Sequence, residues 1–293
     1  MVLGNILFPC LNSIDLTKGT LKLEVFVADN NSQDETIDTV RSRFSHIYFI
    51  TNKDNVGFPA ANNQAIRKTN ARYILLLNPD TIVRPNALQE MVKFMNKNPV
   101  YGVFGPKLAD ENDIEIPHLR SLSFWTYCAS LLGEERLFRK YLPTRKVNYV
   151  SGAALMFRQE LIDKVCLLDE KLFWCEDMDF CLRSILKGHP VGFVQNALVI
   201  HLVGRSGSSN LTLMLEKQYF SKIAYLVKHN EPLETRMIVL LFMVEVAVRW
   251  LKWEIRNAFK SSEESHIRVK TFARLFREIP SLYNHLKFSK SES

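Results

Sequence analysis

A chain of 293 residues can bury a sizeable core in one large domain or two, and its 47% hydrophobic and 24% charged residues are ordinary for a folded protein. The five cysteines are odd in number and lack CxxC spacing, which argues against a disulfide framework or a zinc knuckle and favours buried free thiols. The net charge of +7 is concentrated in the last third, as suits an anionic membrane surface or phosphate ligands, and no nucleic-acid-binding motif is present. The N-terminus has neither a charged n-region nor a cleavage site, so we expect no signal peptide and a cytosolic protein.

Strands and helices alternate at short spacing through most of the chain. The helical spacing of Leu7, Leu11 and Ile14 predicts a short first helix. Apolar runs and turn residues then predict strands at 23–28, 47–50, 73–77, 101–106, 147–157 and 191–200. Helices are predicted between most of these strands, and the segment 107–146 is expected to be an irregular loop or insertion. This order is typical of an α/β protein with a doubly wound parallel sheet.

The strand at 73–77 is the centre of this arrangement. Its five consecutive apolar residues are typical of a parallel strand covered on both faces, and the run ends at Asn78-Pro79, where proline forces a turn. Asp80 therefore follows the carboxyl end of a buried strand, where open α/β sheets bind ligands. The alternative is a turn aspartate that caps the following helix.

From residue 212 the pattern becomes helical and basic, which divides the chain into domains at 1–211 and 212–293. Residues 237–244 are all apolar, but Glu245 and Arg249 interrupt the run before it reaches the roughly 18 residues of a membrane-spanning helix. The later cations, beginning with Lys252, indicate a helix over 236–260 that lies in a membrane interface. The alternative is a buried core helix.

Polar groups follow four of the predicted strands or loops, and a sheet collects such ends along one edge. Asp29 is expected to contact a base or ribose, and Asp80 and His201 to share a divalent cation with phosphate oxygens. Asp177, at the start of a helix beside Glu176, is expected to act as a general base on a hydroxyl nucleophile.

Six strings of residues occur in a fixed order: ADNNSQDET, NVGFPAANN, YILLLNPDT, VSGAALMFR, LDEKLFWCEDMDFCLR and HLVGRS. As a set they resemble glycosyltransferase family 2, and within it the rhamnosyltransferase-like branch, whose members build cell-surface polysaccharides. The resemblance covers about residues 5–230.

The resemblance implies a GT-A fold with a mostly parallel central sheet, flanking helices and a helical C-terminal region. It also implies inverting transfer from a nucleotide-diphosphate sugar, either dTDP-rhamnose or a UDP-hexose, to a lipid-linked or polysaccharide acceptor. Mn²⁺ or Mg²⁺ would be the cofactor, at the cytoplasmic face of the cell membrane.

The family motifs assign roles to individual residues. Asp177 and Glu176 would be catalytic, and Asp80 and His201 would hold the metal. The donor-binding residues would be Asp29, Asn31, Asn55, Gly57, Phe58, Asn62, Asn78 and Asp80. The residues near the sugar and acceptor would be Ser151, Gly152 and Ala153, together with Trp174, whose ring is suited to stacking on a sugar.

Each assignment has a structural alternative. Asp29 is also suited to opening an Asx-type turn, and His201 to a satisfied place in the core. Glu176 is also explained as a helix N-terminal charge, Gly152 by close packing, and Trp174 as a core aromatic. Asp179 and Arg183 are four residues apart, which favours a helical ion pair over contact with substrate.

The chain departs from the family at its start. Family members begin with a strand that contacts the nucleotide, whereas this sequence starts at the helix that follows, so we expect the first, central strand to be missing. A late start site, another segment in its place and lost activity are the three explanations. The alternative function is therefore a non-catalytic relative that binds nucleotide-sugar or a partner without turnover. A Rossmann dehydrogenase is excluded because no GxGxxG follows the first strand.

Overall fold

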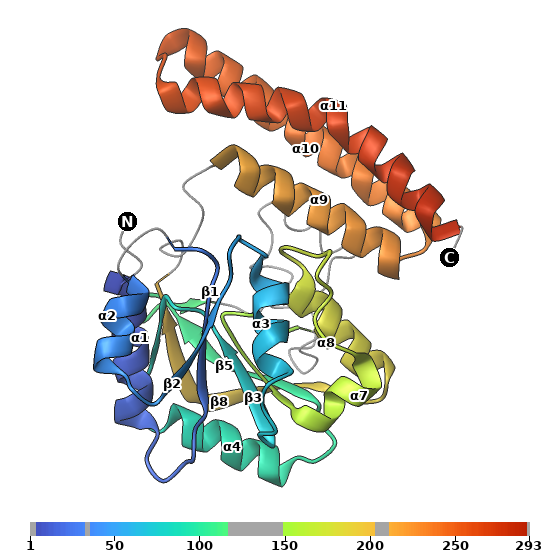
Figure 1. Cartoon of the computed structure of the whole chain (residues 1–293). Helices are drawn as coiled ribbons and strands as arrows, with labels where there is room; N and C mark the ends of the chain where they lie inside the picture. The colour runs from blue at the N-terminus through green and yellow to red at the C-terminus, as the bar shows by residue number, and fades with distance from the viewer. Residues whose placement is uncertain (1–3, 33–35, 117–148, 203–210, 292–293) are drawn as a thin grey trace. The chain divides into compact units, whose positions relative to one another are not determined.

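The computed structural model describes residues 4–32, 36–116, 149–202 and 211–291, which fall into two compact units (Figure 1). The first unit holds all the strands that the structure describes, and the described elements of the second are helices. The strands are β1 (Val25–Asp29), β2 (Ile47–Thr51), β3 (Tyr73–Leu77), β4 (Thr81–Val83), β5 (Val103–Ala109), β6 (Glu115–Ile116), β7 (Ala154–Arg158) and β8 (Val191–His201). The helices of the first unit are α1 (Gly4–Thr17), α2 (Thr36–Arg43), α3 (Phe58–Ile66), α4 (Ala87–Lys97), α7 (Ile162–Val165) and α8 (Glu176–Leu186), with a 3₁₀ turn at Gln159–Leu161.

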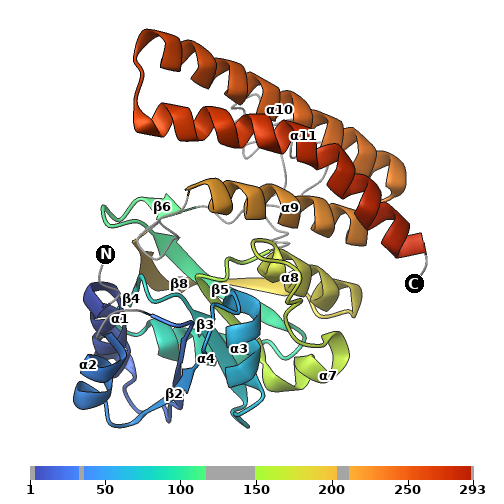
Figure 2. The same ribbon diagram turned by 45° about the horizontal axis from the view of Figure 1, so that its top comes forward.

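The main sheet is mixed, which corrects the expectation of a mostly parallel sheet. Its strand order is β3-β7-β5-β8-β4, with β6 paired to β5, and these strands can be followed in Figure 2. Among these pairs only β5 and β8 run parallel. Strand β7 enters between β3 and β5 antiparallel to both, and the short β4 turns back to pair with β8. The local sequence does not predict the direction of β7 or β4, because a strand's partner is selected by contacts with residues distant in the chain.

Strands β1 and β2 pair parallel with each other and form a separate two-stranded sheet. Within the described part of the chain, no strand pairs with the other edge of β1 or with the edge of β3 away from β7. Four of the five β1 residues are only half-buried, whereas β7 is buried throughout. Among the described residues, the β1–β2 pair and the main sheet are therefore two separate sheets.

Helices cover both faces of the main sheet, because β7 is apolar on both sides. Leu155 and Phe157 face a cluster that includes Phe180 of α8, whose ring lies 5.0 Å from that of Phe157. Ala154 and Met156 face a second cluster, to which the apolar stripe of α4 contributes. Helices α1 and α2 pack on the β1–β2 sheet through a third cluster. These layers hold the strand ends in place.

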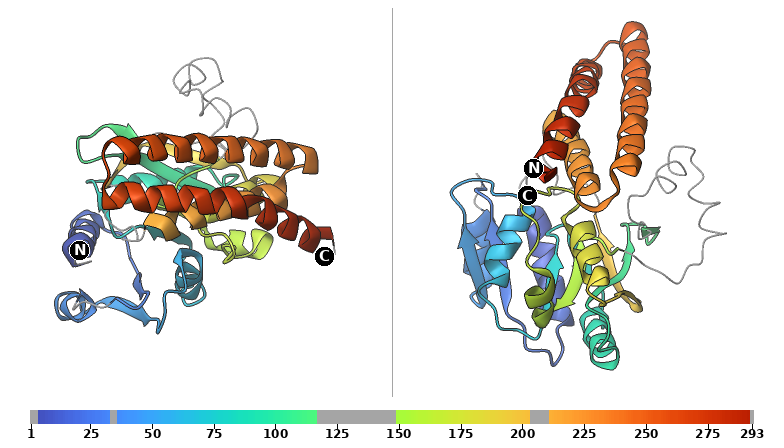
Figure 3. Two further views of the ribbon diagram at one scale, coloured as in Figure 1. Left: turned by 90° about the horizontal axis from the view of Figure 1, so that it is seen from above. Right: turned by 90° about the vertical axis from the view of Figure 1, so that its right-hand side faces the viewer.

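The second unit contains residues 171–175 and three helices, α9 (Leu211–His229), α10 (Pro232–Phe259) and α11 (Glu263–Ser291). Helices α10 and α11 run side by side along most of their length (Figure 3). The hydroxyl of Ser221 in α9 accepts hydrogen bonds from the backbone N–H groups of Phe173 and Trp174, which ties the short segment to the helices. None of the described helices combines the length and hydropathy that crossing a bilayer requires.

The predicted division at 211/212 differs from this grouping of residues, because segment 171–175 joins the helices although it precedes α8 in the chain. Most of the predicted irregular segment 107–146 lies outside the described residues.

Candidate active site

The turn between β3 and β4 brings Asp80 beside His201. Asp80 directly precedes β4, in which Thr81 pairs with His201 of β8. The backbone N–H of Leu202 donates to the carbonyl of Asp80 at 2.8 Å, which fixes the end of β8 against the turn. As a result, Nε2 of His201 lies 3.4 Å from Oδ1 of Asp80. The Asp80 side chain is 1% exposed and that of His201 is 17% exposed, so the pair reaches solvent through the imidazole.

This pair fits a divalent cation as two of its ligands. The carboxylate oxygen is the ligand type that Mg²⁺ and Mn²⁺ prefer, and the imidazole nitrogen suits a transition metal better than Mg²⁺. Within the described ranges, no group of three or more His, Cys, Asp or Glu side chains is placed to hold a metal. A cation at Asp80 and His201 would leave coordination positions open to phosphate oxygens and water.

Helix α8 begins with two buried carboxylates, Glu176 and Asp177, each 7% exposed. Oδ2 of Asp177 accepts hydrogen bonds from the backbone N–H of Gly152 at 2.7 Å and from the hydroxyl of Tyr149 at 3.0 Å. Oδ1 of Asp177 accepts from the backbone N–H of Met178 at 2.7 Å. Oε2 of Glu176 is buried without a hydrogen-bond partner among the described residues. The Asp177 carboxylate is therefore held in one orientation.

Burial shifts the acidity of both groups. It raises the pKa of Asp177 to about 6, against the opposing effect of the hydrogen bonds from Gly152, Tyr149 and Met178. Burial, and after it the charge of Asp177, raises the pKa of Glu176 well above its usual range. An anionic Asp177 beside a protonated Glu176 is the arrangement that avoids two adjacent buried charges. A carboxylate that titrates near pH 6 is suited to accepting a proton near neutral pH.

The turn that precedes β7 links the acidic pair to the Asp80 turn. The N–H of Gly152 reaches Asp177, and the carbonyl of Ala153 accepts from the N–H of Asn78 at 3.0 Å. The hydroxyl of Ser151 accepts from the N–H of Ala153 at 3.2 Å, so this side chain shapes the turn. A Cβ added at Gly152 would lie 3.3 Å from Oδ2 of Asp177, which explains why a residue without a side chain stands there.

The Asn55–Phe58 turn lies beside Gly152. Oδ1 of Asn55 accepts from the N–H of Gly57 at 3.0 Å, and Gly57 has φ 86°, a conformation that favours glycine. The ring of Phe58 comes within 3.6 Å of the position of a Cβ at Gly152. Asn62 donates to the carbonyl of Phe58 at 2.8 Å within α3. The side chains of Asn55 and Asn62 thus stabilise the turn and its helix.

Asp29, at the end of β1, joins this group through its neighbour. Its carboxylate accepts from the N–H of Ser32 at 3.1 Å, as expected of the turn alternative. Asn30 donates to the carbonyl of Gly57 at 3.3 Å, and Asn52 donates to Asn30 at 3.0 Å. Asn31 is exposed, with φ 66° in the left-handed region. The β1 loop is therefore joined to the Asn55–Phe58 turn through Asn30.

Trp174 belongs to the second unit, and it is 44% exposed. It is therefore not the buried core aromatic of the structural alternative. The predicted ion pair of Asp179 with Arg183 is confirmed, with Nη2 2.6 Å from Oδ2 and the aspartate fully buried.

Sequence reasoning missed several residues that shape the site. Tyr149 directly precedes the string VSGAALMFR, and its position before the turn is the only sequence feature that indicates a contact with Asp177. The thiol of Cys10 in α1 lies 3.6 Å from the hydroxyl of Thr81, and burial raises its pKa to about 11. Asn63 is 1% exposed and hydrogen-bonds the backbone of Leu168 in both directions. These contacts span 28 to 105 residues of sequence, so no local pattern shows them.

Comparison with known proteins finds similarity to glycosyltransferases. The family model described as glycosyl transferase family 2 matches residues 5–166. An uncharacterized glycosyltransferase of Methanocaldococcus jannaschii is 23% identical over 182 residues, which is 58% of this chain and 56% of the relative. The N-acetylglucosaminyl-diphospho-decaprenol L-rhamnosyltransferase of Mycobacterium tuberculosis is 23% identical over 228 residues, 67% of this chain and 73% of the relative. The chain thus spans little more than half the length of the archaeal relative.

Among solved structures, the chain is similar to the mannosyltransferase PcManGT from Pyrobaculum calidifontis, solved in complex with GDP-Man and Mn²⁺. The TM-score is 0.57 at 15% sequence identity, and the match covers 97% of this chain and 81% of that one. At this identity the likeness establishes the GT-A fold alone.

Proposed function

Because the chain belongs to glycosyltransferase family 2, we propose that it is an inverting glycosyltransferase that moves a sugar from a nucleotide-diphosphate donor to a hydroxyl of its acceptor. One observation carries the proposal. Two hydrogen bonds donated by backbone N–H groups, from Gly152 to the Asp177 carboxylate and from Asn78 to the carbonyl of Ala153, join a buried carboxylate suited to proton transfer to the turn that bears Asp80. Inverting transfer needs a group for the donor diphosphate and a base for the acceptor, and the two ends of this link supply them.

In the proposed reaction, Asp177 accepts the proton of the acceptor hydroxyl as that oxygen attacks the anomeric carbon. The attack comes from the face opposite the diphosphate, so the new bond forms as the bond to the diphosphate breaks and the configuration inverts. The hydrogen bonds from Gly152 and Tyr149 hold one oxygen of Asp177 in place and favour its charged form. Positioned proton transfer of this kind contributes roughly 10²–10⁴ in rate. Glu176, held protonated by burial, keeps a second negative charge away from the base.

Asp80 and His201 would hold Mn²⁺ or Mg²⁺, and the cation would supply positive charge to stabilise the leaving diphosphate. The GT-A structure with GDP-Man and Mn²⁺ supports this cofactor. Asp29 and the Asn55–Phe58 turn would contact the nucleotide, with Asn31, Asn62 and Asn78 at the donor side. Ser151, Gly152 and Ala153 would lie near the sugar and acceptor.

The donor is proposed to be dTDP-rhamnose or a UDP-hexose. The acceptor is proposed to be a lipid-linked or polysaccharide glycan of the cell surface, used at the cytoplasmic face of the membrane. The similarity to a decaprenol-dependent L-rhamnosyltransferase supports the deoxysugar and the lipid-linked acceptor.

Calorimetric binding of UDP and dTDP, with and without Mn²⁺, tests the donor site. We expect Mn²⁺-dependent binding that Asp80→Ala abolishes, because the variant removes a metal ligand, while Asp163→Ala on the exposed surface binds as the wild type does. Whichever nucleotide binds more tightly, UDP or dTDP, indicates the nucleobase of the donor. A folded wild-type protein that binds neither nucleotide would contradict the proposal.

The second candidate function is a non-catalytic relative that binds nucleotide-sugar or a partner. The separation of the β1–β2 sheet, which carries Asp29, from β3 favours it. Nucleotide binding without sugar transfer or donor hydrolysis, under conditions in which lipid-linked acceptors are supplied, would decide for this candidate.

A further inference from the structure

Helix α10 carries an exposed apolar stripe along its whole length. Its buried residues include Ile238, Phe242 and Val246, which face the core of the helical unit. The large apolar residues that remain exposed are Leu233, Met237, Leu240, Val244, Val248, Leu251, Ile255 and Phe259, with exposed fractions from 39% to 89%. They recur every three or four residues, so they share one face of the helix, and that face lies opposite the buried one.

The stripe is broader than the seam of a two-helix coiled coil. At 3.6 residues per turn, the eight side chains spread over an arc of about 100°. A coiled-coil seam would repeat every seven residues, and in this helix it would place Ala247 and Glu254 at seam positions after Leu240. A wide, uninterrupted apolar face suits a flat apolar medium better than a single partner helix.

Lys252 and Arg256 flank one side of the C-terminal half of the stripe, and the exposed Glu254 flanks the other side. Lys252, Arg256 and Lys260 are exposed, and none has a carboxylate within ion-pair distance in the described part of the chain. Arg256 also lies over the ring of Trp253, 4.8 Å from its centroid. Cations with long apolar stems beside an apolar face complement an anionic lipid surface, because the stems lie on the acyl region while the charges reach the headgroups.

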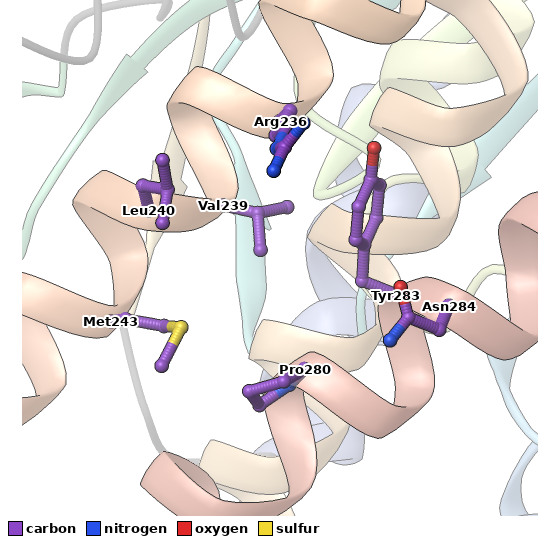
Figure 4. Close-up of a pocket in the computed structure, with 7 residues that line it drawn as sticks. All are labelled: Arg236, Val239, Leu240, Met243, Pro280, Tyr283 and Asn284. Atoms are coloured by element: carbon purple, nitrogen blue, oxygen red, sulfur yellow. The ribbon is translucent and has the colours of Figure 1, made fainter.

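A hollow of about 150 Å³ opens beside the stripe, between α10 and α11 (Figure 4). Val239, Leu240 and Met243 give it an apolar side, and Arg236, Tyr283 and Asn284 bring polar groups to it. Pro280 lies inside α11 at this point, where it has no backbone N–H to donate to the regular helical hydrogen bond. Leu240 belongs to both the hollow and the stripe, so the two form one continuous surface.

We propose that this face of α10 binds the surface of a bilayer that contains anionic lipid, with the helix axis parallel to the membrane plane. Leu251 and Ile255 enter the boundary of the acyl region, and Lys252 and Arg256 contact the headgroups. The hollow receives part of one lipid, whose apolar segment lies against Val239 and Met243 while its anionic headgroup lies at Arg236. This surface does not depend on the activity proposed above, because all its residues lie in the helical unit.

Sedimentation with vesicles tests the surface. The full chain is mixed with phosphatidylcholine vesicles that contain either no phosphatidylglycerol or about one third of it, enough to give an anionic surface. We expect binding to the anionic vesicles that weakens with salt. Leu251→Gln and Ile255→Gln should each weaken it about tenfold, as expected for one lost apolar side chain. Leu186→Gln is the matched control, because Leu186 is 69% exposed in the other unit against 62% for Leu251.

Circular dichroism of the variants checks that they fold, as expected for exposed positions. Wild-type protein that stays in solution with both vesicles, or equal binding by Leu251→Gln and Leu186→Gln, would overturn the proposal. A dimer that dissociates in Leu251→Gln, without vesicle binding by the wild type, would also overturn it and assign the stripe to a second copy of the chain. UDP binding by the same preparations reports on the donor site separately.

Discussion

Asp177 experiences two opposing effects within a few ångströms. Burial disfavours its charge, whereas the hydrogen bonds from Gly152, Tyr149 and Met178 favour it, and the balance brings its pKa to about 6. Its neighbour Glu176 has one oxygen buried without a hydrogen-bond partner among the described residues, and burial raises its pKa well above the usual range. The two carboxylates therefore differ in protonation although they are adjacent in the chain, which is how one can serve as a base beside the other.

Replacing Asp177 by Asn should abolish transfer without destabilising the protein at neutral pH. The raised pKa means that the folded state retains a proton that the unfolded state releases between about pH 4 and pH 6, so wild-type stability falls as the pH rises through that window. Asp177→Asn has no carboxyl group to titrate, so its stability does not fall in this pH window. We expect its thermal midpoint to equal or exceed that of the wild type at pH 7 and to match it near pH 4, and we expect transfer to fall at least 100-fold.

Thermal unfolding at a series of pH values measures the effect, and Asp163→Asn on the exposed surface is the control. Tyr149→Phe, in contrast, should increase the loss of stability at neutral pH. It removes a donor to the charged carboxylate, so the pKa of Asp177 rises and the loss of stability extends to higher pH. A lower midpoint for Asp177→Asn than for the wild type at pH 7, with equal midpoints at pH 4, would contradict this assignment.

Arg158 connects two elements of the main sheet and its covering layer. It ends β7, is 8% exposed, and donates through its guanidinium to the carbonyls of Met95, Asn98 and Tyr101. These carbonyls lie at and just beyond the C-terminal end of α4, where helical carbonyls lack partners in the helix and positive charge is favoured. The arginine therefore fixes α4 to β7, the strand that follows the Gly152 turn.

Replacing Arg158 by Leu should lower the free energy of unfolding by roughly 3–5 kcal/mol, because a buried charged network is broken and carbonyls are left without donors. Chemical denaturation of the first unit measures the loss. Lys187→Leu, which removes an exposed cation, should change stability by less than about 0.5 kcal/mol. A similar effect for both variants would mean that Arg158 adds no more than a surface charge does.

Each of the two units has a buried core of its own. In the first, Phe157 and Phe180 are fully buried at the sheet, and in the second, Phe242 is fully buried against Tyr219 at a ring separation of 5.8 Å. The residues proposed to bind the donor all belong to the first unit. Stability contributed by a ligand should therefore appear in one unit and not in the other.

Scanning calorimetry should resolve this difference as two transitions. Phe242→Ala is expected to lower the transition of the helical unit, and Phe157→Ala that of the α/β unit, each by about 3–5 kcal/mol for a buried phenylalanine. Nucleotide with Mn²⁺ at about 100 times its dissociation constant should raise only the α/β transition, by roughly 2.7 kcal/mol. A single transition that both variants and the ligand shift equally would show that the units unfold together.

The sequence alone predicted six of the eight described strands, all but the short β4 and β6, and the positions along the chain of the residues proposed to bind ligands. Apolar runs such as 73–77 and turn residues such as Asn78-Pro79 act locally, so they predict elements and their ends, and the order of the motifs identifies the family. Only the tertiary structure decided that β7 runs antiparallel to β3, that β1 pairs with β2, and that Tyr149 reaches Asp177. It also decided which face of α10 is exposed, because residues 237–244 are apolar on all sides and have no periodicity to indicate it. The physical reason is that strand partners, buried hydrogen bonds and helix faces are selected by residues far away in the sequence.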